Sequence, residues 1–226
     1  MREEHDLQSD PQPAPREPSS ALSAALIGAL AAACVVGFGV YLATIEVPRP
    51  PEVGEGATLL PVPLEIPEFA LSDHRGRPFD RSRLEGRWSL LFFGYTYCPD
   101  VCPITLQNLS PVQEALAAAP DAGAVQVVFV SVDPERDSRE RLAEYVGFFH
   151  PDLLGVTGEP PEIDRLAKAV GAFYRKADDD APADGYLVDH SAKLFLVDPG
   201  VRMRAVLDDP HEPEEFLELL GRIRSL

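Results

Sequence analysis

The sequence predicts an α/β domain that follows a single membrane-spanning helix near the N-terminus. Three observations support this prediction. No charged residue occurs from Pro18 to Ile45. From about Leu64 onward, short apolar runs typical of buried strands alternate with amphipathic runs typical of helices. Two cysteines, Cys98 and Cys102, stand where one of these strands gives way to a helix.

Composition divides the chain into four segments. Residues 1–20 are polar and rich in proline, which predicts a disordered tail on the cytoplasmic side. Residues 21–45 form an apolar run longer than the roughly 20 residues that a membrane helix needs. The run is also longer than the apolar core of a cleaved signal peptide, so it predicts a transmembrane signal anchor. Residues 46–67 contain six prolines, which predicts a semi-rigid linker. Residues 68–226 then form the folded domain.

The charges beside the apolar run give a weak signal for orientation. Arg2 and Arg16 precede it and Arg49 follows it, so the positive-inside rule favours a cytoplasmic N-terminus by one charge. Cys34 lies inside the run, and Leu30 is four residues before it rather than the three expected of a lipoprotein signal. We therefore interpret Cys34 as a small apolar residue of the span.

The net charge of −17 excludes one class of function. Nucleic acid would be repelled by such a chain, because its own backbone is a row of negative charges. An acidic surface could steer a cation or a basic partner toward the domain, or it could serve solubility alone. The charge leaves both interpretations open.

The predicted elements of the domain follow one another in a regular order. Continuous apolar runs predict buried strands, and the last two strands read as an antiparallel pair joined by a turn at 198–200. A cap at Asp137 or Ser138 opens the second helix. In chain order the elements are a strand at 88–95, a helix at 103–119, a strand at 125–133, a helix at 138–149, a strand at 152–158, a helix at 162–170, strands within 186–198 and at 201–207, and a helix at 213–224.

The cysteine pair indicates the chemistry. A helix N-terminus presents unpaired N–H groups and a partial positive charge, and both favour a thiolate over a thiol. Cys98 and Cys102 lie about one helical turn apart, so they can form a disulfide or hold one metal ion. Three intervening residues, instead of the two of a redox C-x-x-C motif, favour the metal. With this pair in place, the order of elements is that of a thioredoxin-like fold, a central mixed sheet flanked by helices.

Other polar residues have simpler interpretations. We expect His74 to lie in a turn at the surface. Three further histidines, His5, His150 and His211, are also expected at the surface. Asp133 and Glu135 are interpreted as surface turn residues that shape a loop facing the cysteines. Asp189 could orient the neighbouring His190 or remain in solvent.

Four stretches resemble one known family. FGYTYCPDVCP (93–103) is similar to the signature of the Sco/SenC family, SVDPERDS (131–138) to its second motif, and YLVDHSAKLFLVDPG (186–200) to its third. FALSDHRGRPFD (69–80) resembles the opening hairpin of the same family. The resemblance covers most of Phe69 to Gly200, with three motifs in the right order.

The resemblance implies a thioredoxin fold that binds copper, as Cu(I) or Cu(II), through two thiolates and one imidazole. Matched residue by residue, the ligands are Cys98, Cys102 and His190, and the two cysteines also form the redox pair. The chemistry agrees, because soft thiolates prefer Cu(I) and imidazole suits either oxidation state. A structural zinc site would use four protein ligands, and the sequence offers no obvious fourth.

Three functions are compatible with these sequence features. The first is a copper chaperone, not an enzyme, that serves the cytochrome c oxidase subunit carrying the binuclear copper site. The second is a thiol–disulfide oxidoreductase that keeps the cysteines of that subunit reduced. The third is a peroxiredoxin-like peroxidase, suggested by Thr96 near Cys98. Peroxiredoxins place this threonine three residues before the cysteine, whereas here it is two before, so this function ranks last. Further expected partners are another copper carrier or a thiol reductant. The expected location is a bacterial inner membrane, with a single span and the C-terminal domain in the periplasm.

Overall fold

The structure is a computed structural model that describes residues 20–44, 53–119, 124–177, 185–210 and 212–226, with side chains described from residue 25 onward. The chain divides into two compact units, Met1–Val47 and Pro48–Leu226. The predicted tail up to position 19 and the predicted linker over 46–52 lie outside the described residues. The flanking charges at positions 2, 16 and 49 and the histidines at 5 and 211 also lie outside them.

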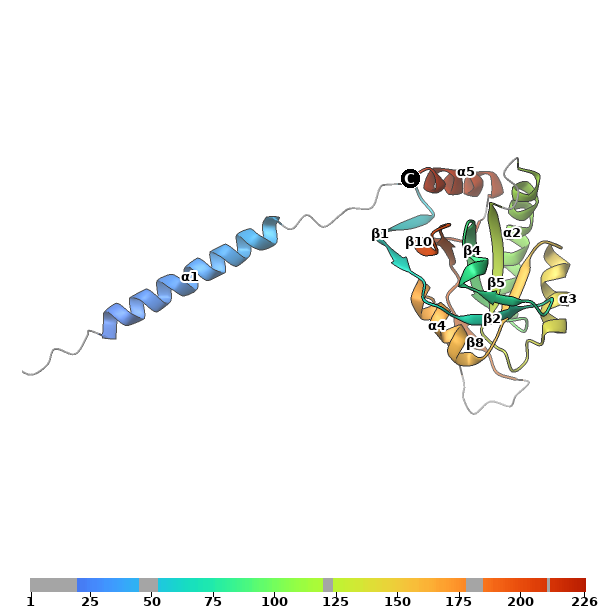
Figure 1. Cartoon of the computed structure of the whole chain (residues 1–226), viewed down its shortest axis with the longest axis horizontal. Helices are drawn as coiled ribbons and strands as arrows, with labels where there is room; N and C mark the ends of the chain where they lie inside the picture. The colour runs from blue at the N-terminus through green and yellow to red at the C-terminus, as the bar shows by residue number, and fades with distance from the viewer. Residues whose placement is uncertain (1–19, 45–52, 120–123, 178–184, 211) are drawn as a thin grey trace, which may run out of the picture. The chain divides into compact units, whose positions relative to one another are not determined.

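The first unit contains one apolar helix, α1 (Ser20–Thr44), drawn in blue in Figure 1. Its segment Ala25–Thr44 has a mean hydropathy of 2.2, and no part of that segment is buried. By length and composition α1 is a candidate to cross a membrane, in agreement with the span predicted over 21–45.

The second unit is built on a mixed sheet of eight strands in the order β1-β10-β9-β4-β5-β6-β2-β3. β4, β5 and β6 are parallel, and the remaining pairings are antiparallel. This arrangement confirms the predicted α/β fold with a central mixed sheet. The strands are β1 (Ala57–Glu65), β2 (Ala70–Asp73), β3 (Pro78–Asp80), β4 (Trp88–Gly94), β5 (Val125–Ser131), β6 (Leu154–Thr157), β9 (Leu194–Val197) and β10 (Arg202–Leu207).

Helices flank this sheet (Figure 1). They are α2 (Val101–Ala118), α3 (Arg139–Phe149), α4 (Pro160–Val170) and α5 (Pro213–Arg224), with a short 3-10 helix, η1 (Arg81–Arg83), before β4. α2 contacts both α3 and α5, whereas α4 packs against β1 and β2. Ser138 caps α3, because its side chain accepts a hydrogen bond from the N–H of Arg141, which decides between the two predicted caps.

The register of β4 against β5 places the loop that carries the cysteine pair beside the loop that carries Asp133, at one edge of the sheet. Gly94, the last residue of β4, pairs with Ser131, the last residue of β5. Both strands are buried along almost their whole length, as their continuous apolar sequences predict. The loops that leave them therefore start side by side, one toward the cysteine pair and the other toward Asp133.

The prediction of a linker over 46–67 is wrong for its last part. Residues 57–65 instead form β1, the edge strand that pairs with β10. Pro61 and Pro63 obscured this strand, because proline has no N–H to donate to a neighbour. An edge strand tolerates them, and the register of β1 shifts between Leu59 and Leu64, where both prolines lie.

A second, smaller sheet joins β7 (Tyr174–Lys176) to β8 (Val188–His190). The sequence did not predict β7. The stretch predicted to hold strands, 186–198, contributes β8 to this small sheet and β9 to the large one. The small sheet fixes the position of His190, which pairs with Tyr174.

We predict that β1 contributes to the stability of the domain, which a linker would not. Leu59 is 5% exposed, so Leu59→Ala should lower the free energy of unfolding by about 2–4 kcal/mol. Val62 on the same strand is 63% exposed, and Val62→Ala should change it by less than about 0.5 kcal/mol. Chemical denaturation of the full chain in detergent measures both. Equal, small effects would mean that β1 does not form.

Candidate metal centre

The two cysteines lie in the turn between the central strand β4 and α2. Cys98 precedes the helix, and its N–H donates to the carbonyl of Tyr95 at 3.2 Å. Cys102 lies in the first turn of α2. Cys102 is fully buried, whereas Cys98 is 9% exposed. The pair therefore has one inner sulfur and one that solvent can reach.

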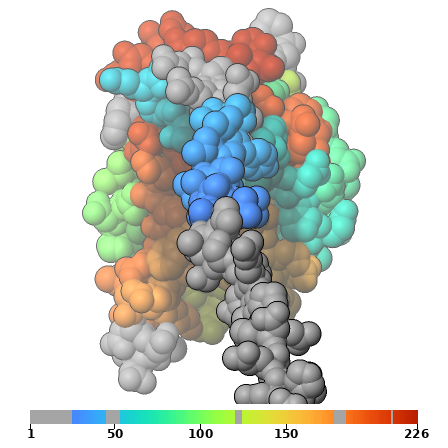
Figure 2. All heavy atoms as spheres, turned by 90° about the vertical axis from the view of Figure 1, so that its left-hand side faces the viewer, coloured from blue at the N-terminus to red at the C-terminus, as the bar shows by residue number. Residues whose placement is uncertain are grey.

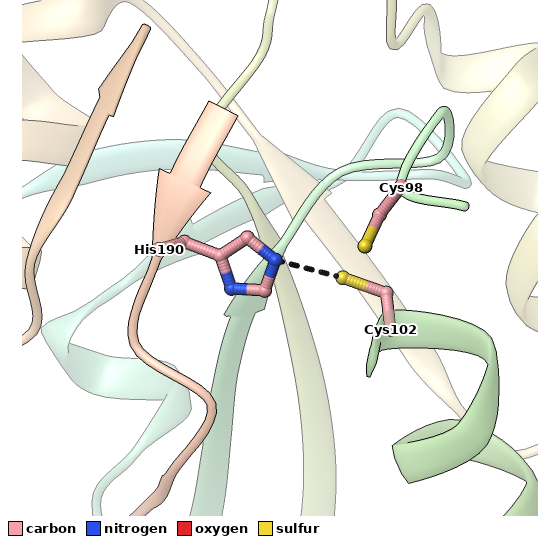
Figure 3. Close-up of side chains that lie close together, drawn as sticks. All are labelled: Cys98, Cys102 and His190. Atoms are coloured by element: carbon pink, nitrogen blue, oxygen red, sulfur yellow. Dashed lines mark hydrogen bonds between the residues drawn. The ribbon is translucent and has the colours of Figure 1, made fainter. Parts of the chain in front are cut away.

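The small sheet brings His190 to this pair (Figure 3). The Nε2 atom of His190 lies 3.3 Å from the Sγ atom of Cys102. The ligand atoms of Cys98, Cys102 and His190 all lie within 4.8 Å of one another. Among the described residues, this is the only group of three or more His, Cys, Asp or Glu side chains that converges in this way. The three residues predicted from the sequence are thus brought together.

The surroundings of His190 leave one ring nitrogen free for a metal. Nδ1 lies 3.4 Å from the carbonyl oxygen of Ser191, which can only accept a hydrogen bond. With a metal bound, Nδ1 can therefore donate its proton to this carbonyl while Nε2, which faces the sulfurs, gives its lone pair to the metal. The rings of Phe92 and Tyr95 meet the imidazole edge to face, with centroids 6.3 and 5.8 Å away, and restrict its rotation.

Gly94 makes room for the inner sulfur. A Cβ atom at this position would lie 2.5 Å from Sγ of Cys102 and 2.8 Å from Cε2 of Phe129. Both separations are far below van der Waals contact, so the close approach of Cys102 to the end of β4 requires glycine.

A buried carboxylate fixes the turn that leads to the cysteines. Asp137 is fully buried and accepts hydrogen bonds from the N–H and the hydroxyl of Thr96, at 3.0 and 2.7 Å, and from the hydroxyl of Ser131. Burial raises the pKa of Asp137. Because the Thr96 hydroxyl gives its one proton to Asp137, it is not free to bind a peroxide, which counts against the peroxidase hypothesis.

The prediction that Asp133 is a surface turn residue is wrong. Asp133 is 2% exposed, forms an ion pair with Arg136 and accepts a hydrogen bond from the hydroxyl of Tyr186. Arg136 also donates to the carbonyl of Tyr186 at 3.0 Å, and its guanidinium lies 3.5 Å from the centre of that ring. These contacts tie the loop after β5 to the residues just before β8, and so help to position His190.

A second contact holds β8 from the cysteine side. The N–H of Val188 donates to the hydroxyl of Tyr95 at 3.2 Å. Tyr95 thus binds Cys98 through its carbonyl and the strand of His190 through its hydroxyl. The only sequence signal for this role is its place inside the cysteine motif.

The remaining candidates lie away from the centre. His74 is half-buried and accepts a hydrogen bond from the N–H of Gly155 at 3.1 Å, so its expected surface position is wrong. Burial lowers the pKa of His74. Asp189 points to solvent, where it forms an ion pair with Arg175. It does not orient His190.

The two sulfurs differ in acidity. The pKa of Cys98 is lowered to about 4, first because the Cys102 side chain hydrogen-bonds to it, and then through His190 and the N–H groups of Asp100 and Cys102, against the effect of burial. The same hydrogen bond and burial raise the pKa of Cys102. The metal-free pair therefore shares one proton, with the negative charge on the outer sulfur.

This donor set has a clear chemical preference. Two thiolates and one imidazole suit a soft or borderline metal, and three ligands leave the shell open to a ligand from elsewhere. Without a metal, the same sulfurs can close into a disulfide. The fold and the site together define a thioredoxin-like protein with a Cys-Cys-His group that could hold a metal ion.

Comparison with known proteins gives the family. The family model described as SCO1/SenC matches residues 60–224. The chain belongs to the SCO1/SenC family. It is 42% identical to the mouse (Mus musculus) mitochondrial protein SCO2 homolog over 155 residues, which are 69% of this chain and 60% of the mouse protein. It is 39% identical to the human (Homo sapiens) mitochondrial protein SCO1 homolog over 132 residues, 58% of this chain and 43% of the human protein.

Solved structures of relatives agree with the fold. ScoI from Bradyrhizobium japonicum with copper bound has a TM-score of 0.62 at 33% identity, over 71% of this chain and 98% of that one. Yeast Sco1 with copper bound has a TM-score of 0.65 at 30% identity, over 73% and 91%. The match spans less than two thirds of the length of the curated mammalian relatives.

We predict that Cys98 reacts with iodoacetamide at an almost constant rate between about pH 5.5 and 8, because a thiol with a pKa of about 4 is already ionised there. An ordinary thiol would react about tenfold faster for each pH unit in this range. Peptide mass spectrometry measures the rate at each cysteine. Cys102→Ala should restore a steep pH dependence at Cys98, since it removes the main cause of the low pKa. A steep profile in the unsubstituted chain would contradict the assignment.

Proposed function

We propose that the chain is a membrane-anchored copper chaperone that helps to assemble the binuclear copper site of cytochrome c oxidase. The observation that carries this proposal is the convergence of Cys98, Cys102 and His190 within 4.8 Å, in a member of a family with copper-bound relatives. Its partners are the oxidase subunit that carries this copper site and a copper carrier or thiol reductant that loads or reduces the chaperone.

The geometry suits a cargo that must be both held and released. Cys102 and His190 present two donor atoms 3.3 Å apart, and aromatic rings restrict the rotation of the imidazole. Cys98 lies at the solvent side and carries the charge before loading. Three protein ligands leave the soft cation open to attack by a thiolate or imidazole of the partner.

The difference in acidity between the sulfurs favours a second function, thiol–disulfide exchange. The Cys98 thiolate would attack a disulfide of the oxidase subunit, forming a mixed disulfide and releasing one partner thiolate. Cys102 would then lose its proton and attack Cys98, which closes the Cys98–Cys102 disulfide and releases the second partner thiol. The chain would be oxidised and the partner reduced, by two electrons.

The reduced chain should bind one copper ion, because two thiolates and one imidazole complete a single site. Copper analysis after dialysis gives the stoichiometry of the full chain in detergent. Cys98→Ser and Cys102→Ser should each abolish tight binding, and His190→Ala should weaken it. His74→Ala is the matched control and should bind as the unsubstituted chain does. Full binding in both cysteine variants would refute the site.

Oxidation should separate the two functions, since the metal and the disulfide need the same sulfurs. We expect the oxidised chain to take up little copper until a reductant is added. For exchange, His190→Ala should retain reduction of a disulfide peptide taken from the oxidase copper loop while binding copper more weakly. If delivery in a reconstituted assembly also survives His190→Ala, exchange rather than copper transfer is the function.

We propose that the domain faces the periplasm of a bacterial inner membrane, anchored once by α1. A cysteine pair that can form a disulfide needs a compartment where oxidation persists, which supports this side of the membrane. A phosphatase reporter that requires disulfides, fused after Leu226, should be active, and a fluorescent reporter that folds only in the cytoplasm should be dark. The reverse pattern would overturn the orientation and the delivery role together.

A further inference from the structure

A cleft of about 370 Å³ opens at the edge of the sheet opposite the metal centre. Arg83 and Arg87 precede β4, while Val125 and Leu154 open β5 and β6, and all four line the cleft. Because β4, β5 and β6 are parallel, their first residues share one edge and their last residues the other. The cysteine pair follows the end of β4, so the cleft and the metal centre lie at opposite edges.

The lining of this cleft is basic in an acidic chain. Arg75, Arg77, Arg83 and Arg87 line it together with one carboxylate, Asp152. The whole chain has 20 lysine and arginine residues against 37 aspartate and glutamate residues, so four arginines around one cleft run against its composition.

A second cleft of about 500 Å³ shows the contrast. It lies between α5 and the residues before β1, whose surfaces adjoin in Figure 2 in red and cyan. Six carboxylates line it, from Glu55, Asp208, Asp209, Glu212, Glu215 and Glu218, with Arg222. The basic and acidic side chains are thus segregated into separate clefts.

Buried groups hold the backbone that carries these arginines. Asp73 is fully buried and accepts from the N–H of Arg75 at 3.0 Å, the N–H of Arg77 at 2.8 Å and Nε of Arg77 at 2.9 Å. Nε2 of Gln126 donates to the carbonyl of Arg83 at 2.9 Å and to Ser89 at 2.8 Å. The turn between β2 and β3 and the start of β4 are therefore fixed before any ligand arrives.

The guanidinium groups themselves keep free donors. In the part of the chain that the structure describes, no ion pair joins Arg75, Arg83 or Arg87 to a carboxylate. Arg75 donates from Nε to His74 and from one terminal nitrogen to the carbonyl of Pro151, which leaves its other terminal nitrogen. Arg77 uses Nε toward Asp73, which leaves its two terminal nitrogens. Guanidinium forks of this kind match the oxygens of a phosphate or carboxylate.

Gln113 on α2 adds a neutral polar side chain to the lining of this cleft. Its side chain lines the cleft, the residue is 6% exposed, and its Oε1 atom is buried without a hydrogen-bond partner. Such a group costs about 1–3 kcal/mol unless something completes its hydrogen bonds. The amide N–H groups of this side chain could donate to an ionised phosphate oxygen in the cleft.

We propose that this arginine cleft (Arg75, Arg77, Arg83, Arg87 and Gln113) binds a phosphate group. Its volume accommodates a phosphate with a small substituent. Two sources share this chemistry, free inorganic phosphate and the headgroup of an anionic phospholipid, which a chain with an apolar candidate span would meet at a bilayer. Because the cleft and the metal centre lie at opposite edges, a bound phosphate leaves the cysteines accessible.

Isothermal titration of the full chain in a neutral detergent at low ionic strength tests the proposal. The probes are inorganic phosphate, dihexanoylphosphatidylglycerol below its micelle concentration, and dihexanoylphosphatidylcholine as the zwitterionic control. The double variant Arg83→Gln/Arg87→Gln should weaken phosphate-group binding about tenfold or more. Arg165→Gln/Lys168→Gln removes the same charge from α4, outside the cleft, and should change affinity less than about twofold.

Gln113→Leu separates a ligand contact from a structural role. It removes the buried amide at similar size, so it should weaken binding while the melting temperature stays the same or rises. Phosphatidylglycerol binding about tenfold tighter than phosphate would identify the lipid headgroup, and the reverse order would identify the free anion. If neither anionic probe binds, if phosphatidylcholine binds as tightly as phosphatidylglycerol, or if the α4 variant loses as much affinity as the cleft variant, the proposal is wrong.

Discussion

The metal centre depends on the contact between Sγ of Cys102 and Gly94, the last residue of β4, which has no side chain. Gly94 pairs with Ser131, and its carbonyl accepts from the N–H of Val132, so its backbone cannot move away from the sheet. Sγ of Cys102 fills the space that a Cβ would take. This close approach sets the first turn of α2 against the end of β4. It also explains why Cys102 is buried, while Cys98, at the outer side of the turn, is reached by solvent.

The third donor atom comes from a different part of the fold and needs its own anchors. β8 belongs to a two-stranded sheet, which by itself would be marginally stable. Two tyrosines connect it to the large sheet, since Tyr95 accepts from Val188 and Tyr186 is bound by the ion pair of Asp133 and Arg136. The buried charges beside the centre thus have a positional role. They hold the imidazole at the distance where it can share a cation with the sulfurs.

Features of the fold that depend on neighbouring residues were predictable from the sequence. Features that depend on contacts between residues far apart in the sequence were not. The central strands were predictable from apolar runs, a helix cap at Asp137 or Ser138 from cap chemistry, and the three donor residues from the motifs. Asp133 resembled a surface residue because its sequence is charged, whereas its partner Tyr186 stands 53 positions away. β1 was missed because Pro61 and Pro63 suggest a linker, and only its place at the sheet edge makes them tolerable.

The acidic surface of the domain and the sulfur and imidazole ligands of the metal centre select cations in different ways. Carboxylates such as those lining the cleft beside α5 offer hard oxygens, which attract cations generally and prefer hard ones. The centre offers two sulfurs and a neutral imidazole, enclosed by the rings of Phe92 and Tyr95. Attraction by the surface therefore need not compete with binding at the centre, because the donor atoms prefer different ions. The net charge of −17 can raise the local concentration of every cation, while sulfur chemistry decides which one stays.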